Sequence, residues 1–121
     1  MVLNKSNDKW MLTIERKDNL LGLINIIRYL DDINGDINKN KINGLQFEMN
    51  LQELESVNSE LIAQFVILQT SLVRYNGRLK IVEANPELKG TFDVVMLDKI
   101  ISIQYLGLEE SDSYDDDYSE E

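Results

Sequence analysis

The 121-residue chain contains no cysteine and no histidine. The absence of cysteine excludes disulfide bonds, thiol chemistry and Cys-ligated metals, and it is compatible with a reducing cytoplasm. Histidine is the commonest general base of enzymes and cysteine their best nucleophile, so two main catalytic groups are missing. We therefore predict that the chain is not an enzyme and that it uses no cofactor.

Signatures of several ligand sites are missing too. The chain has no glycine-rich loop of the Gly-x-Gly-x-x-Gly or Walker type, so a nucleotide cradle of standard form is excluded. Asp31, Asp32 and Asp36 lack the spacing of an EF-hand, and no glutamate stands at its twelfth position. Lysine and arginine form no cluster or stripe, which argues against a nucleic-acid partner. Neither a metal nor a nucleic acid is expected.

Long apolar segments are also absent. The first nine residues contain no apolar stretch of signal-peptide length, and polar residues interrupt every apolar-rich run before it could span a membrane. We therefore expect a cytoplasmic protein with no direct membrane insertion.

Acidic residues are concentrated at the C-terminus. Residues 109–121 contain eight acids and no base, so of the net charge of −10 only −2 remains for residues 1–108. Segments of this composition are typically disordered. We predict a flexible N-terminus at 1–8, a single domain at 9–108 and a disordered acidic tail at 109–121.

The second half of the chain alternates strand and helix patterns. Residues 45–51 and 78–84 alternate apolar and polar side chains, which indicates strands, and 100–105 is rich in β-branched residues. Between them, residues 60–75 predict a helix that stops at Asn76-Gly77, and the only proline, Pro86, opens a helix at 86–98. This alternation favours parallel strands joined by right-handed helical crossovers.

The first half begins with a strand at 10–16, whose apolar residues alternate. Apolar residues from Leu20 to Ile33 recur with helical spacing, which predicts a helix at 19–33 that stops at Asn34-Gly35. An alternative is that Leu20–Leu23 is strand and that the helix starts later. Residues 37–43 are polar and predict a connection. The fold class is α/β, with a small mixed sheet and about three packed helices.

The junction between the strand at 45–51 and the following helix resembles the signature of STAS domains, the anti-sigma-factor-antagonist family. That signature is an apolar strand, a short loop, an apolar residue, then Asp-Ser-Ser/Thr-Gly and an apolar helix, and Met49–Ile62 is similar to it. Tyr75–Ile81 resembles the family's entry to its next strand, and Asn85–Leu88 the start of its last helix. The family usually has a second N-terminal strand, which this chain does not show at the expected place.

The resemblance implies a docking loop for a serine-kinase-like anti-sigma factor, in which the second hydroxyl residue is phosphorylated and the phosphate expels the partner. Asn58 falls on the family's Asp, Ser59 on the first Ser and Glu60 on the phosphorylated residue. The equivalent of the switch loop comprises Ser56, Asn58, Ser59, Glu60 and Leu61. Glu60 replaces the removable charge by a permanent one. Ser59 is interpreted as the helix N-cap, with phosphorylation of Ser59 as the alternative.

These patterns predict a non-catalytic interaction module, similar to an anti-sigma-factor antagonist, in a partner-switching signalling circuit. Two alternatives remain open: a scaffold subunit that assembles with other STAS proteins, and a carrier of a small ligand or lipid. The helix at 60–75 is apolar on more than one face, so it is either central in the domain or buried by a second copy in a homodimer.

Overall fold

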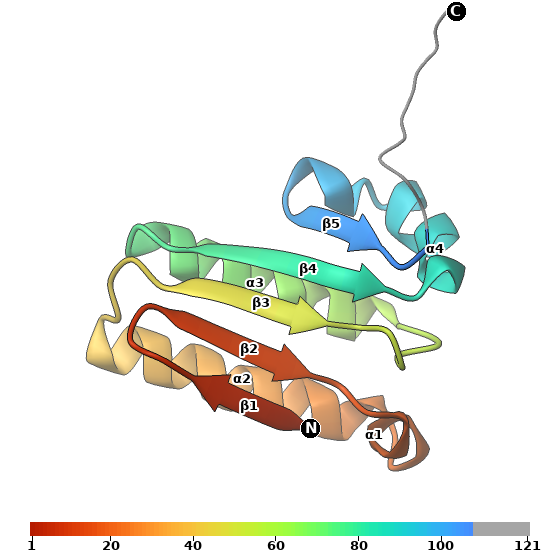
Figure 1. Ribbon diagram of the computed structural model, residues 1–121, viewed down its shortest axis with the longest axis horizontal. Coiled ribbons are helices and arrows are strands. Elements are labelled where there is room, and N and C mark those ends of the chain that lie inside the picture. Colours follow the sequence, from red (N-terminus) through yellow and green to blue (C-terminus); the bar gives the residue numbers. More distant parts are fainter. Residues whose placement is uncertain (108–121) are drawn as a thin grey trace, which may run out of the picture.

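The computed structural model describes residues 1–107, which form a five-stranded sheet with helices on one face (Figure 1). The strands are β1 (Val2–Lys5), β2 (Lys9–Thr13), β3 (Gln46–Asn50), β4 (Arg78–Ala84) and β5 (Ser102–Tyr105). The helices are α1 (Arg16–Leu20), α2 (Leu23–Asn40), α3 (Ser59–Arg74) and α4 (Lys89–Val94), with 3₁₀ turns η1 (Pro86–Leu88) and η2 (Leu97–Lys99). The acidic tail predicted at 109–121 lies outside the described residues.

Strand order in the sheet follows the sequence, from β1 to β5. β1 pairs antiparallel with β2, whereas β2, β3, β4 and β5 are parallel neighbours. Successive right-handed crossovers in one direction place their helices on the same face of a sheet. α2 and α3 accordingly pack side by side behind the strands, and the carboxyl ends of β2, β3 and β4 meet at one edge (Figure 1). The predicted α/β fold with a small mixed sheet is confirmed.

The core lies between this sheet and α2 and α3. Alternate residues of β2, β3 and β4 are buried on the helix side, while their neighbours on the other face remain partly exposed. The buried strand residues include Trp10, Leu12, Phe47, Met49, Leu79 and Ile81, and the buried helix residues include Ile26, Leu30, Leu61, Phe65 and Leu68. No helix within residues 1–107 is both long and apolar enough to cross a membrane.

The prediction of a flexible N-terminus at 1–8 was wrong, because this segment contains β1. Leu3 lies opposite Leu12 in the antiparallel register and packs against the core. The ammonium group of Lys5 lies 4.3 Å from the centre of the Trp10 ring, a cation–π contact. β1 therefore gives the sheet a second strand ahead of α1. The polar composition of β1 gave no strand pattern in the sequence, since an edge strand buries only one side.

The predicted helix at 19–33 was wrong at both ends. α1 ends at Leu20, and Gly22, with a φ of 96°, separates it from α2. The break shifts the helical phase, so Leu20 is 81% exposed although it was assigned to the buried face. α2 then continues through Gly35 to Asn40, because Ile37 extends its buried stripe. The polar connection predicted at 37–43 is therefore mostly helix.

The remaining elements agree better with the sequence patterns. α3 and β4 lie within one residue of their predicted bounds, and β3 is one residue shorter at each end. The predicted helix at 86–98 is divided into η1, α4 and η2. Met96 takes a left-handed conformation with a φ of 57°, which ends the helix early. Short helices leave more of their apolar side chains at the surface.

The link from α3 to β4 depends on Asn76 and Gly77. Asn76 adopts a φ of 65°, and the Gly77 N–H donates to the Leu72 carbonyl at 2.7 Å, which together form a Schellman cap. A Cβ atom on Gly77 would clash with the carbonyl oxygen of Leu45, at the entry to β3. The helix stop predicted from Asn76-Gly77 is thus also a point of close backbone contact.

We expect Gly77→Ala to lower the free energy of unfolding by about 1–3 kcal/mol, because the methyl group meets immobile backbone. Gly35→Ala is the matched control. Gly35 lies inside α2 with no atom within 4 Å of an added Cβ, so alanine should stabilise the protein by about 0.5–1 kcal/mol. Urea unfolding of the two variants measures both effects. Equal stabilities would contradict the close-contact argument.

Gln69 is a buried polar residue on the core side of α3. Its Oε1 accepts a hydrogen bond from the Leu79 N–H of β4 at 2.8 Å, and its Nε2 donates to the Ile100 carbonyl at 2.9 Å. β5 begins only opposite Lys80, so the side chain supplies the partner that the sheet does not offer to Leu79. Gln69 therefore ties α3 to the segment that carries α4 and η2.

Replacing Gln69 by methionine, which has a similar shape, should lower the free energy of unfolding by about 1–3 kcal/mol, since the Leu79 N–H and the Ile100 carbonyl lose their partner. Gln64→Met is the control on the same helix. The Gln64 Oε1 is buried without a hydrogen-bond partner, so this change should be neutral or stabilising. Thermal or urea unfolding compares the two, and an equal loss would contradict the proposed bridge.

Candidate functional site

The loop between β3 and α3 lies at the carboxyl edge of the sheet and is attached to α1. The Arg16 N–H donates to Glu53 Oε1 at 2.8 Å, and Asn19 Nδ2 donates to the Glu53 carbonyl at 2.8 Å. The guanidinium of Arg16 also pairs with the Glu55 carboxylate at 3.0 Å. Two of the acids near this junction therefore position the loop.

Asn58 is the N-cap of α3, in an extended conformation with a φ of −124°. Its Oδ1 accepts a hydrogen bond from the Leu61 N–H at 2.8 Å. The interpretation of Ser59 as the cap was wrong by one residue, because Ser59 is already the first helical residue. The hydroxyl of Ser59 is thereby left at the surface, beside the exposed carboxylate of Glu60.

Asn58→Ala should lower the free energy of unfolding by about 1 kcal/mol, the usual cost of losing an N-cap side chain. Ser59→Ala, one residue further along, should change it by less than about 0.5 kcal/mol, as is usual for surface substitutions away from caps. Chemical unfolding of both variants tests the assignment. A larger loss for Ser59→Ala than for Asn58→Ala would return the cap to Ser59.

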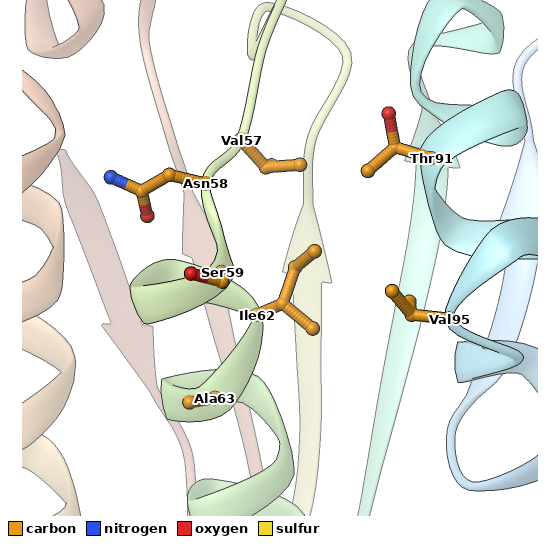
Figure 2. A pocket seen from close by; sticks show the side chains of 7 residues that line it. All are labelled: Val57, Asn58, Ser59, Ile62, Ala63, Thr91 and Val95. Carbon is orange, nitrogen blue, oxygen red and sulfur yellow. The ribbon is translucent and has the colours of Figure 1, made fainter.

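An apolar groove of about 420 Å³ lies between the start of α3 and α4 (Figure 2). In this view the side chains of Val57 and Ile62 point across it toward Thr91 and Val95. The lining residues are Val57, Asn58, Ser59, Ile62, Ala63, Thr91 and Val95. The groove thus directly adjoins the junction that the resemblance marked as a docking loop.

The structure brings most of the predicted site residues to one surface. Ser56, Asn58, Ser59 and Glu60 are all exposed, whereas Leu61 is wholly buried in the core and is closed to any partner. Glu60 stands in the first turn of α3, where the positive end of the helix dipole favours a negative charge. The junction therefore presents two hydroxyl groups and a fixed carboxylate beside an apolar groove.

Sequence reasoning missed the α4 wall of the groove. Thr91 and Val95 were assigned to the longer helix predicted at 86–98. In the structure α4 ends at Val94, and the side chains around this end lie at the surface, with Val94 82% and Met96 56% exposed. The consecutive apolar residues Val94-Val95-Met96 were a signal, since no amphipathic helix buries three adjacent positions. A second exposed apolar pair, Leu20 and Leu21, lies at the end of α1.

The charges around α4 are largely paired or at the surface. Lys89 Nζ lies 2.8 Å from Asp93 Oδ2, an exposed pair one helical turn apart. Behind them, burial and then the carboxylates of Asp93 and Asp98 raise the pKa of Tyr105 to about 12. The Tyr105 phenol is therefore neutral at physiological pH. Within residues 1–107, no group of three or more acidic side chains is arranged to hold a metal ion.

Comparison with known proteins shows which fold this is. No model of a known protein family matches the chain, and no curated protein matches it. Solved structures do match it, and two of them are of one protein, TM1081, a candidate anti-sigma factor antagonist of Thermotoga maritima. Its NMR structure aligns with a TM-score of 0.64 and 17% identity over 86% of this chain and 79% of TM1081. Its crystal structure aligns with a TM-score of 0.58 and 17% identity over 85% and 84%.

At 17% identity this likeness shows a shared fold. The STAS-like fold expected from the sequence resemblance agrees with it, because the resemblance was to anti-sigma-factor antagonists and TM1081 is a candidate member of that class.

Proposed function

We propose that this chain is a non-catalytic interaction module of the cytoplasm, which binds a protein partner in the manner of an anti-sigma-factor antagonist. The observation that carries the proposal is the coincidence of two independent features. The sequence resemblance selects residues 56–61, and three of the groove-lining residues, Val57, Asn58 and Ser59, belong to that same segment. The fold shared with TM1081 supports it further.

The proposed contact combines apolar burial with one fixed charge. A partner side chain that enters the groove would remove Val57, Ile62 and Val95 from water, at roughly 25 cal/mol per Å² of apolar surface. Glu60 would stand beside it with about one negative charge, against roughly 1.5–2 for a phosphoserine. A partner evolved for this chain would therefore offer a lysine or arginine to Glu60 instead of avoiding it.

The partner-switching step would then need a different source of control. With a permanent charge at position 60, phosphorylation at that residue cannot release the partner. Ser59 is exposed in the first turn of α3, where the helix N-terminus stabilises a phosphate, and it is the residue we propose for a remaining switch. A serine-kinase-like anti-sigma factor is the partner class that such a site fits.

A second candidate is a scaffold subunit that assembles with other STAS proteins. The exposed apolar residues of α3 favour it, since Ile67 is 42% and Val73 53% exposed. Affinity purification from the native cell separates the two: an anti-sigma-like kinase supports the antagonist, and co-purifying STAS subunits support the scaffold.

If the proposed contact is right, Glu60→Gln should weaken binding of the recovered partner by about fivefold or more, because an interfacial cation would lose its counter-charge. Asp36→Asn, which neutralises an exposed acid on α2, should leave the affinity unchanged. Titrations of wild type and both variants at low and high salt measure this. Equal affinities of all three proteins would show that the partner binds at another surface. Tighter binding of Glu60→Gln would exclude a partner cation that faces Glu60.

A further inference from the structure

α3 carries a second apolar stripe on the side away from the sheet. The core stripe consists of Leu61, Phe65, Leu68 and Leu72, all fully buried. The outer stripe, at helical spacing, has the exposed residues Ser59, Ala63, Ile67, Thr70 and Val73, and beside them Ile62 and Val66, which are half-buried and also touch the core. Among the 16 residues of the helix only Glu60 and Arg74 are charged, one in each terminal turn. An ordinary surface helix is polar on its outer side, so this stripe needs a cover.

The outer stripe is complementary to itself in the antiparallel direction. Inverting α3 about the bond between Val66 and Ile67 places these two residues opposite each other. It also places Ala63 opposite Thr70, two small side chains that allow close approach of the helices. Towards the ends, Glu60 then meets the last turn that carries Arg74. A twofold contact requires such self-complementarity, because each residue of one copy must meet its symmetric counterpart.

We propose that a second copy of this chain covers the stripe, with the two α3 helices antiparallel about a twofold axis near Val66 and Ile67. The lateral arrangement of the side chains agrees with this occupant. Arg74 Nη1 donates to Asn38 Oδ1 at 3.0 Å, so Arg74 lies on the side of α3 that faces α2. Glu60 projects toward that same side, since 14 residues span almost four full turns.

The groove lies on the opposite side of α3, toward α4. Val73 lies about 100° from Arg74 around the helix, away from the side that faces α2. Ile62 lies at nearly the same angle as Val73, so the two residues share one side of α3. A twofold axis perpendicular to the helices keeps these sides together. The Val73 side chain of the second copy therefore reaches the groove beside Ile62, and its Arg74 reaches Glu60. One symmetric contact thus fills an apolar groove and pairs a charge at each end.

The dimer does not depend on the proposed function, but it uses the same surface. Glu60 and the groove would be covered by the second copy, so self-association and binding of another protein partner exclude each other. The contact is essentially one helix stripe per copy, smaller than a standard interface of about 800 Å² per partner. We therefore expect a weak, reversible dimer that a tighter partner displaces.

Sedimentation equilibrium of the full chain, from about 10 μM to about 1 mM, is the first test, since small interfaces associate in this range. We expect a reversible monomer–dimer equilibrium that Val73→Ser weakens about tenfold or more. Val2→Ser is the matched control, because Val2 is similarly exposed, at 43%, but lies on the edge strand β1. A monomer throughout, or an equal effect of both variants, would overturn the proposal.

A charge exchange provides the specific test. Glu60→Arg and Arg74→Glu should each weaken dimerisation, because each creates like charges at both ends of the contact. The double variant restores opposite charges and should recover dimerisation to within about threefold of wild type, as coupled pairs do. Failure of the double variant to recover would overturn the antiparallel contact. If Glu60→Gln still changes partner affinity in that case, the proposed function stands without the dimer.

Discussion

Parallel pairing of β2, β3 and β4 determines where the candidate site lies in this molecule. Parallel strands need helical crossovers, and their right-handedness places α2 and α3 on one face of the sheet. The pairing also brings the carboxyl ends of the strands together, so that α1, the loop before α3 and the turn before α4 meet at one edge. The backbone contact between Gly77 and Leu45 and the bridge of Gln69 to Leu79 and Ile100 keep these crossovers close to the sheet.

The junction at the start of α3 combines a residue that caps the helix with residues that face the solvent. Asn58 satisfies the helix terminus, which leaves Ser59 and Glu60 exposed beside the groove instead of occupied in capping. A fixed carboxylate here is compatible with the helix dipole, and it gives a permanent electrostatic preference for a cationic partner group. The same carboxylate pairs with Arg74 in the proposed dimer. Under the proposed function and the proposed dimer, competition between two partners for one surface would take the place of the charge switch that a phosphorylated residue provides.

How far the sequence predicted the fold depended on whether an element buries a regular pattern. α3, β3 and β4 were predicted nearly to the residue, because their periodicity and the stop at Asn76-Gly77 are strong local signals. β1 was missed, since only Leu3 of this edge strand packs inward. Gly35 was taken as a helix stop, although the buried residues Ile33 and Ile37 on either side of it belong to the same face of α2. Burial of a whole stripe outweighs the helix cost of one glycine, about 1 kcal/mol.

By itself the sequence determined the α/β class and the absence of cysteine and histidine chemistry, because these depend on composition and local pattern. Its resemblance to STAS domains marked the segment from Ser56 to Leu61 as the candidate docking loop. Only the tertiary structure decided that Leu61 is buried, that Asn58 is the cap, and that Thr91 and Val95 complete a groove with Val57 and Ile62. The groove joins residues about 30 positions apart, and such a contact depends on how α4 packs beside α3. No local periodicity encodes that packing, since β4 separates the two helices in the chain.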